Sequence, residues 1–332
     1  MFERKVRIPK VILLAALLPL LLLLSGCAGK EPPAEKEEGL LLGFAQIGSE
    51  SSWRIGNTRS VQEAAQRHGI RLMMADANQK QENEIRSLRS FIAYRVDVLA
   101  FVPIVEDGWE NVLREAKQAG IPIILSDRQI SPDIDEELYD AYVGADFLAE
   151  GRRAGEYLLR KIEDMGAERL RIVELSGTPD STPALERARG FRDALEGDDR
   201  FQILETVSGD FLRSKGKECM RQLLSGWKGQ VDVLYSHNDG MTLGAIEAIE
   251  EAGLQPGKDI VIITVDGEQA AIDLLREGKI NCVVECTPML GEAVMDLAER
   301  LKAGETVPRN TYPEETMFTE YDDLDAIAPR GY

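Results

Sequence analysis

Residues 96–126 read VDVLAFVPIVEDGWENVLREAKQAGIPIILS, and this stretch determines the fold. Two short apolar runs, 96–102 and 121–126, flank a segment, 108–119, whose apolar residues recur with helical spacing. Near-continuous runs of Val, Ile and Leu are typical of strands that are covered on both faces of a sheet. A helix between two such strands is the crossover that parallel pairing requires. The stretch therefore predicts a β-α-β unit.

The same alternation extends in both directions along the chain. A first series has expected strands at 40–47, 70–75, 96–102, 121–126 and 142–145, with helices at 54–68, 79–93 and 108–119. A second series has expected strands at 170–175, 201–207, 231–236, 259–265 and 279–285. Its helices are expected at 148–163, 183–195, 212–225, 241–252 and 269–277, before a last long helix at 289–303. Two successive series predict an α/β protein with two doubly wound parallel-sheet lobes.

The N-terminus has the features of an export signal. Four basic residues within 4–10 precede an apolar run at 11–24, which is shorter than the ~20 residues of a membrane-spanning helix. The run ends in Leu24-Ser25-Gly26-Cys27, which resembles the bacterial lipobox. The resemblance implies that 1–26 is a lipoprotein signal peptide and that Cys27 is lipidated. The alternative is an uncleaved signal anchor.

The segment behind the lipobox is rich in Lys, Glu and Pro and has no apolar periodicity, so we expect residues 27–39 to be a solvated tether. The mature protein would then be exported and lipid-anchored, at the outer face of the cytoplasmic membrane or in the periplasm. The lipid anchor would be its only contact with the membrane.

Charge and residue usage exclude several classes of function. The chain has a net charge of −19, and removal of 1–26, which carries a net charge of +3, leaves about −22. So acidic a chain is a poor binder of nucleic acid, whose phosphates it would repel. Only two histidines, His68 and His237, are present, which argues against a histidine-rich metal site. We therefore expect no metal and no cofactor.

The remaining cysteines are Cys219, Cys282 and Cys286. The last two are four residues apart in an expected strand, roughly 13 Å between Cα atoms, which is too far for a disulfide. Buried free thiols are the favoured interpretation. A bridge from Cys219 to either of the other two is left open.

Polar and aromatic residues gather where the expected strands end. In open α/β sheets, ligands bind beyond the carboxyl ends of the strands. The residues found there are Glu50, Trp53, Arg54, Asp76, Asp127, Arg128, Asp210, Phe211, Asn238, Asp239, Asp266 and Glu285. Sugar hydroxyls need hydrogen-bond donors and acceptors, and the C–H face of a sugar ring needs an aromatic plane. The residue types therefore predict a carbohydrate ligand.

Each of these residues also has a purely structural interpretation. Asp76 and Asp239 are equally well explained as helix N-caps, Trp53 as a core residue, and Asp127 with Arg128 as a surface ion pair. Their joint placement at strand ends in both halves of the chain favours the ligand site.

The motifs of common enzyme classes are missing. The sequence contains no phosphate-binding G-x-x-x-x-G-K-[ST], no G-x-G-x-x-G after a strand and no G-x-S-x-G elbow. A glycosidase-like carboxylate pair from Asp127, Asp239, Asp266 and Glu285 is the remaining enzymatic alternative. Two similar lobes around a polar cleft suit reversible capture better, so we expect a binding protein and not an enzyme.

Several segments resemble the type I periplasmic sugar-binding proteins of the ribose-binding-protein class, over nearly all of 40–332. Within that class the chain is most similar to galactofuranose-binding proteins of ABC transporters. The resemblance lies in Gly48-Ser-Glu-Ser-Ser-Trp-Arg54, Asp76-Ala-Asn-Gln-Lys-Gln-Glu-Asn-Glu-Ile85, Gly108-Trp-Glu110, Asp127-Arg128, Ser208-Gly-Asp-Phe-Leu-Arg-Ser-Lys-Gly-Lys217, His237-Asn-Asp-Gly-Met241 and Val265-Asp-Gly267.

The resemblance implies two lobes joined by a three-stranded hinge. The N-terminal lobe would comprise 40–144 plus 286–313, and the C-terminal lobe 145–285 plus 314–332. It further implies a monosaccharide site, for galactofuranose or a related aldose, formed by Glu50, Trp53, Arg54, Asp127, Arg128, Arg187, Phe211, Asn238, Asp266 and Glu285.

The roles implied for these residues differ. Trp53 and Phe211 would sandwich the sugar ring, and Glu50 with Arg54 would hold its exposed hydroxyls. Asp127 and Arg128 would bind hydroxyls and the ring oxygen from the first lobe. The other four residues would complete the site from the second lobe. One departure concerns Phe147, where many members of the class have an asparagine that could bind a hydroxyl.

The implied partners are the permease subunits of an ABC importer. The alternative is a receptor that presents bound sugar to a sensor kinase or chemoreceptor. The class shares its fold with LacI-type repressors, but here a signal peptide and lipobox occupy the place of their DNA-binding helices.

Overall fold

The computed structural model describes residues 39–332 apart from residue 228. The expected signal peptide, Cys27 and residues 28–38 of the expected tether lie outside the described residues. Among the residues that are described, we find no helix with the length and apolar character needed to cross a membrane.

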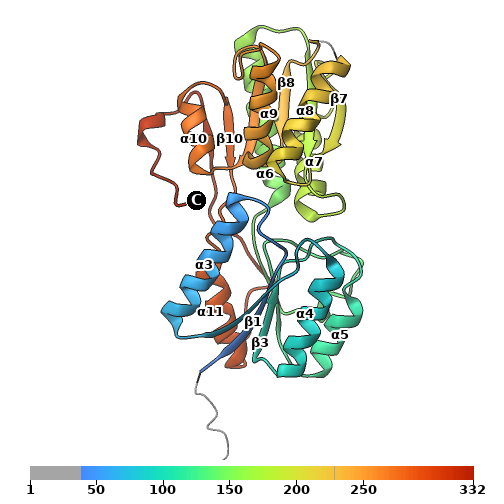
Figure 1. The fold of residues 1–332 in the computed structure, drawn as a ribbon, viewed down its shortest axis with the longest axis vertical. Helices are drawn as coiled ribbons and strands as arrows, with labels where there is room; N and C mark the ends of the chain where they lie inside the picture. The colour runs from blue at the N-terminus through green and yellow to red at the C-terminus, as the bar shows by residue number, and fades with distance from the viewer. Residues whose placement is uncertain (1–38, 228) are drawn as a thin grey trace, which may run out of the picture. The chain divides into compact units, whose positions relative to one another are not determined.

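The first sheet has six strands in the order β11-β5-β4-β3-β1-β2, and all its neighbouring pairs are parallel. The strands are β1 Leu41–Gln46, β2 Arg71–Asp76, β3 Val98–Phe101, β4 Ile123–Ser126, β5 Ala141–Val143 and β11 Asn310–Thr311. The helices around them are α3 Ser52–His68, α4 Gln81–Tyr94, α5 Glu110–Gln118 and α11 Gly291–Lys302, with a 3₁₀ turn, η1, at Glu136–Leu138. Figure 1 shows α3 beside α11 on one face of the sheet and α4 beside α5 on the other.

The second sheet also has six strands, in the order β12-β10-β9-β8-β6-β7. They are β6 Leu170–Ser176, β7 Phe201–Ser208, β8 Val233–Ser236, β9 Val261–Asp266, β10 Cys282–Glu285 and β12 Met317–Thr319. The helices are α6 Phe147–Met165, α7 Thr182–Ala194, α8 Arg213–Trp227, α9 Asp239–Glu251 and α10 Gln269–Arg276, followed by a 3₁₀ turn, η2, at Leu324–Ala326. The edge strand β12, where no strand was expected, pairs antiparallel with β10, and the other neighbouring pairs of this sheet are parallel.

Alternation along the strands places the core on both faces of the second sheet. Ile262 of β9 belongs to an apolar cluster with α8, α9 and α10, whereas Ile263 belongs to a cluster with α6 and α7. Successive side chains of a strand point to opposite faces, so a strand covered on both sides must be apolar throughout. This is why the central strands read as unbroken Val, Ile and Leu.

The chain passes between the two sheets three times: between β5 and α6, between β10 and α11, and between β11 and β12. The doubly wound two-lobe α/β fold predicted from the sequence is confirmed. The exact limits of the lobes stay a prediction. The three described cysteines are free thiols, so Cys219 forms no disulfide with Cys282 or Cys286.

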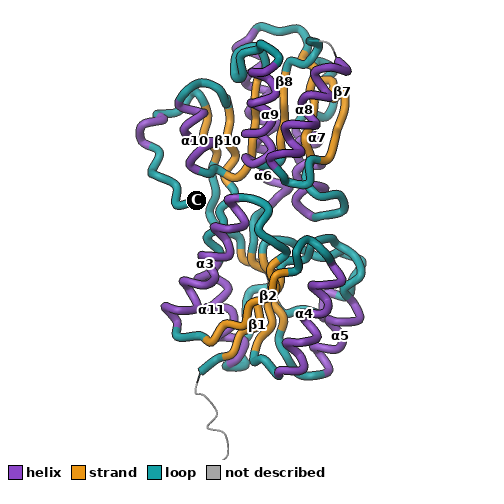
Figure 2. The backbone as a smooth tube through the Cα atoms, in the orientation of Figure 1, coloured by secondary structure: helices purple, strands orange, loops and turns teal. Residues whose placement is uncertain are grey.

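The carboxyl ends of the strands in one lobe face those in the other. Figure 2 shows the strands of each sheet ending in loops that lie between the lobes. Hydrogen bonds join the two lobes here: Glu106 N donates to Asp180 O at 3.0 Å, Gln129 N donates to Thr182 Oγ1 at 3.0 Å, and Thr182 Oγ1 donates to Gln129 O at 3.3 Å. The strand ends therefore enclose the space between the two sheets.

Candidate ligand-binding site

A cavity lies between the strand ends of the two sheets. Its walls are formed by Glu50, Ser51, Trp53, Arg54, Asp127, Arg128, Phe147, Pro183, Arg187, Phe211, Asn238, Asp266 and Cys286. Nine of the ten residues expected from the sequence lie in these walls.

The start of α3 supplies two of the large side chains. Ser51 is the N-cap: its Oγ accepts a hydrogen bond from Arg54 N at 3.1 Å, which fixes the first turn of the helix. Trp53 is buried, and its indole Nε1 donates to Cys286 O at 2.7 Å, while the Arg54 guanidinium lies 4.7 Å from the centre of its ring. Trp53 is thereby held against Cys286, in the segment through which the chain passes from β10 to α11.

A chain of buried charges crosses the first-lobe side of the cavity. Arg54 Nε lies 3.1 Å from Glu50 Oε1, and Arg54 Nη2 lies 2.6 Å from Asp127 Oδ2. Burial opposes the charged guanidinium, but the two carboxylates outweigh it and raise the pKa of Arg54. Burial, together with the charge of Arg54, lowers the pKa of Arg128 to about 10. Arg128 is held by Ile104 O at 3.0 Å, and its Nε is 4.0 Å from Asp127 Oδ2.

Three residues of this charge chain have buried polar atoms without a hydrogen-bond partner. They are Glu50 Oε2, Arg54 Nη1 and Arg128 Nε. A buried polar atom that is left unpaired costs about 1–3 kcal/mol, and more when the group is charged. The residues that carry these atoms line the cavity, so a ligand with several hydroxyls is suited to offer them hydrogen bonds.

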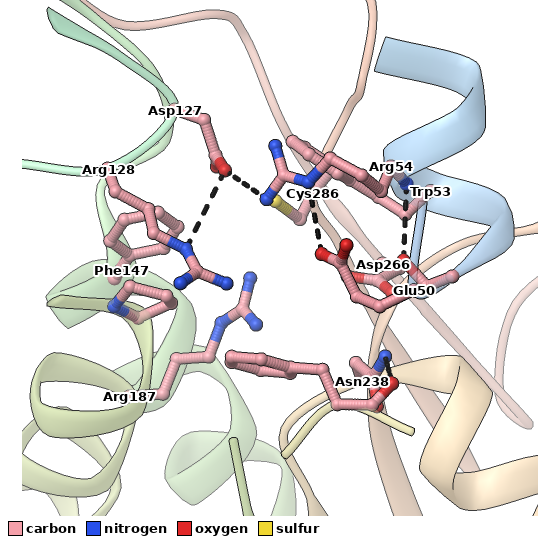
Figure 3. Close-up of a pocket in the computed structure, with 13 residues that line it drawn as sticks. Glu50, Trp53, Arg54, Asp127, Arg128, Phe147, Arg187, Asn238, Asp266 and Cys286 are labelled. Carbon is pink, nitrogen blue, oxygen red and sulfur yellow. Dashed lines mark hydrogen bonds and ion pairs between the residues drawn. The ribbon is translucent and has the colours of Figure 1, made fainter. Parts of the chain in front are cut away.

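Arg187 of α7 reaches the cavity from the second lobe. Its Nε donates to Glu150 Oε2 at 2.7 Å, and its Nη1 donates to His237 O at 2.6 Å. The guanidinium lies 5.1 Å from the ring centre of Phe147. Figure 3 shows the side chains of Arg128 and Arg187 extending toward each other across the cavity. The Phe147 side chain cannot form a hydrogen bond with a sugar hydroxyl, and its ring packs against the Arg187 guanidinium.

Phe211 and Asn238 form a connected part of the wall. Asn238 is the N-cap of α9: its Oδ1 accepts from Met241 N at 3.0 Å, and its Nδ2 donates to Phe211 O at 3.2 Å. The Arg128 guanidinium lies 5.3 Å from the ring centre of Phe211. Trp53 and Phe211 both line the cavity, and the sandwich of a sugar ring between them stays a prediction.

Asp266 ends β9 and carries a carboxyl group in the wall. Burial and the neighbouring carboxylate of Asp239 raise the pKa of Asp266 well above its ordinary value. The pKa of Asp239 is itself raised to about 8 by burial and by Glu268. Asp239 does not line the cavity; its Oδ2 accepts from Gly267 N at 2.7 Å and so holds the turn after Asp266. Asp239 therefore has a structural role, but the N-cap interpretation is wrong, because Asn238 caps α9.

Three cavity residues have a left-handed backbone although they are not glycine. The φ angles are 62° at Asp127, 61° at Phe211 and 125° at Asp266. Such conformations are uncommon for residues with a Cβ atom, and they concentrate at functional sites. Three of the eight described non-glycine residues with a positive φ thus lie in the wall of this cavity.

The structure does not bring Glu285 to the cavity, contrary to expectation. Its carboxylate forms an ion pair with Arg330 and accepts a hydrogen bond from Thr316 N at 3.1 Å. The wall residues that the sequence analysis did not assign are Ser51, Phe147, Pro183 and Cys286. Asp76 and Asp210 line a neighbouring cavity, which shares Glu50 with the first.

Among the described residues, Glu150, Cys286 and Glu315 form a group of potential metal ligands, whose ligand atoms lie within 4.8 Å of one another. Arg187 already places a cation 2.7 Å from the Glu150 carboxylate. A metal ion would meet this positive charge, so we assign no metal to the group.

Known proteins resemble this chain over most of its length. It is 39% identical over 299 residues to the galactofuranose-binding protein YtfQ of Escherichia coli K12, covering 88% of this chain and 93% of that protein. A crystal structure from Mycobacterium smegmatis in complex with β-D-fucofuranose superposes with a TM-score of 0.83 at 43% identity, over 87% of this chain and 93% of the other. The periplasmic binding protein of an arabinose ABC transporter from Shewanella sp. ANA-3, bound to α- and β-L-arabinofuranose, superposes with a TM-score of 0.80 at 40% identity, over 84% and 92%.

These similarities confirm the resemblance that the sequence motifs indicated. They also confirm that the chain is related to binding proteins and not to enzymes. The family model of the periplasmic binding protein domain matches residues 42–306, and the chain therefore belongs to this family.

Proposed function

We propose that this protein binds an aldose in its furanose form, galactofuranose first, in the cavity between the two sheets. The three relatives described above are named for galactofuranose or were crystallised with fucofuranose or arabinofuranose. These ligands share a five-membered ring. The similarity of 39–43% over most of the chain supports the same ring form here.

The observation that carries this proposal is a set of buried polar atoms that have no hydrogen-bond partner and belong to residues of the cavity wall. Glu50 Oε2 can accept, and Arg54 Nη1 and Arg128 Nε can donate. Trp53 and Phe211 add aromatic surface to the same wall. A sugar offers hydroxyls for the polar atoms and C–H groups for the aromatic faces. An apolar ligand would leave these polar atoms without hydrogen bonds. The ligand needs no charge of its own, because hydroxyl groups can both donate to Glu50 and accept from Arg54 and Arg128.

We further propose that the protein serves an ABC sugar importer and is anchored through lipidated Cys27. The sequence of the lipobox supports the anchor, and the name of the Shewanella relative supports the importer. A receptor for a sensor kinase or chemoreceptor would use the same binding chemistry. Neighbouring genes distinguish the two roles: permease and ATPase genes favour transport, and a kinase gene favours sensing.

Binding and ring form can be tested together with residues 28–332, which include the whole described unit. Calorimetry with D-galactose, D-fucose and L-arabinose measures affinity, and ¹³C NMR of the bound C1-labelled sugar identifies the ring. We expect furanose signals in the bound state. Only a minor fraction of free galactose is a furanose, so the apparent affinity is reduced by that fraction.

Two variants make the test specific to the cavity. Asp127→Asn should weaken binding of every sugar, whereas Asp133→Asn, at an exposed position outside the cavity, should not change it. Pyranose signals would refute the furanose form of the ligand but would still support the proposal that the cavity binds a sugar. Binding of none of the aldoses would refute the sugar site itself.

A further inference from the structure

Residues 330–332, which we call the clasp, lie between helix α3 of the first lobe and the turn after Asp266 in the second. Figure 1 marks this end of the chain between α3 and α10. The clasp contributes no residue to the cavity wall. Its contacts nevertheless reach a wall residue.

On the second lobe, the clasp binds the backbone of the Asp266 turn. Tyr332 Oη donates to Asp266 O at 3.1 Å, and Arg330 Nε donates to Gly267 O at 3.1 Å. Arg330 also forms the ion pair that occupies Glu285, and its Nη2 donates to Tyr332 Oη at 3.1 Å. The carbonyls of two successive residues are thus held by two side chains of the clasp.

The clasp has further contacts at its base and on the first lobe. Gln269 N donates to Tyr332 O at 2.9 Å, which places the start of α10 against the clasp. The guanidinium of Arg59, in α3, donates to Gly331 O. A Cβ atom at Gly56 of α3 would lie 3.0 Å from Tyr332 Cβ, so helix and clasp are in close contact. The clasp therefore joins α3 to the second sheet.

The turn that the clasp holds has an unusual backbone. The φ angles are 125° at Asp266 and 91° at Gly267. Two donors meet the Asp266 carbonyl, Cys286 N at 2.9 Å and Tyr332 Oη at 3.1 Å. A strained conformation persists only where its surroundings determine it. Because the Asp266 side chain lines the cavity, the donors on its carbonyl also determine where its carboxyl group lies.

We propose that the clasp is a positioning segment for ligand binding: Tyr332 and Arg330 fix the Asp266 turn so that the Asp266 carboxyl group faces the sugar. The proposal rests on the proposed function, because Asp266 is one of the residues assigned to the sugar. It also gives Glu285 a role. Glu285 does not contact the ligand but anchors Arg330, and so acts on the site through the clasp.

Tyr332→Phe tests the proposal because it removes one hydroxyl and keeps the ring. Without sugar, hydrogen exchange at the Cys286 amide, which donates to the same carbonyl, should become several-fold faster. With sugar, the dissociation constant should rise about 3- to 10-fold, the effect of one hydrogen bond. Tyr94→Phe, at an exposed tyrosine of α4, is the control and should change neither quantity.

A double-mutant cycle separates positioning from a general loss of stability. If Tyr332 acts through Asp266, Tyr332→Phe should have little further effect on affinity in an Asp266→Asn background. An equal loss of affinity in both backgrounds would overturn the proposal, as would unchanged Cys286 exchange in the single variant. The exchange measurement needs no sugar. A wild-type protein that binds no sugar would therefore refute the proposed function, while exchange still decides whether the clasp holds the turn.

Discussion

Gly177 is the position where a single methyl group should disturb the cavity most directly. It follows β6, and a Cβ atom there would lie 1.8 Å from Phe211 Cζ, with Cε2 at 2.2 Å and Cε1 at 2.3 Å. Ordinary contact begins near 3.4 Å, so the ring or the backbone must move by about 1.6 Å in Gly177→Ala. Phe211 is buried in the cavity wall, so its ring has little room to move without changing the wall.

Two measurable effects follow from this displacement. Overpacking of this kind costs about 1–3 kcal/mol of folding stability. At about 2–4 °C per kcal/mol for chains of 150–250 residues, Tm should fall by roughly 2–12 °C. The displaced ring loses its aromatic contact with the sugar, and narrowing of the cavity adds to the loss of affinity. We therefore expect at least a tenfold weaker affinity, which corresponds to about 1.4 kcal/mol.

Calorimetry and thermal unfolding of Gly177→Ala give both quantities. Gly226→Ala is the matched control, because nothing lies within 4 Å of the added atom in α8, and it should leave affinity unchanged. Adding Phe211→Leu to Gly177→Ala should recover part of the lost Tm, since a smaller side chain accommodates the methyl group. Unchanged sugar affinity in Gly177→Ala would refute the assignment of Phe211 to the sugar site.

Three further predictions concern charge, pH and anchoring. Arg54 and Asp127 are a buried pair at 2.6 Å, so Arg54→Ala and Asp127→Ala should each lower the free energy of unfolding by ~3–5 kcal/mol, and the double variant by less than their sum, in urea unfolding. Burial raises the pKa of Glu315 from 4.5 to about 8, so the stability it contributes is present below pH 4.5 and lost as pH rises through 8. Glu315→Gln should therefore be more stable than wild type at pH 9 in thermal unfolding, whereas Glu314→Gln, at an exposed position, should match wild type. Cys27→Ser should release the protein from the membrane fraction without lowering its Tm, and unchanged retention would indicate an uncleaved anchor.

The central strands and the long helices were predictable because burial on both faces leaves a strong apolar pattern. β11 and β12 were not predictable in the same way. Asn310–Thr311 and Met317–Thr319 are too short for a periodic signal, and their pairing with β5 and β10 depends on the passages between the sheets. Only the assembled sheets show where these strands belong.

The site was predictable where function places a charged or aromatic residue directly after a strand, as at Asp127 and Asp266. It was not predictable at Pro183 and Cys286, which line the cavity without a distinctive chemical group. Glu285 also ends a strand, so it met the same criterion. Its carboxylate is occupied by Arg330, 45 residues further along the chain, and no local pattern reveals that pairing.

The left-handed backbone at Asp127, Phe211 and Asp266 has a consequence for laboratory evolution of this protein. Each such residue costs of order 1–3 kcal/mol, and Phe211 lacks the short polar side chain that makes this region tolerable for aspartate. Glycine at 211 would relieve this strain, but it would also remove a buried aromatic ring, and truncation of a buried phenylalanine costs about 3–5 kcal/mol. Because this loss exceeds the strain, selection for heat resistance and selection for growth on a scarce sugar should both retain the phenylalanine. The same library would then keep the strained residue at this position under either regime.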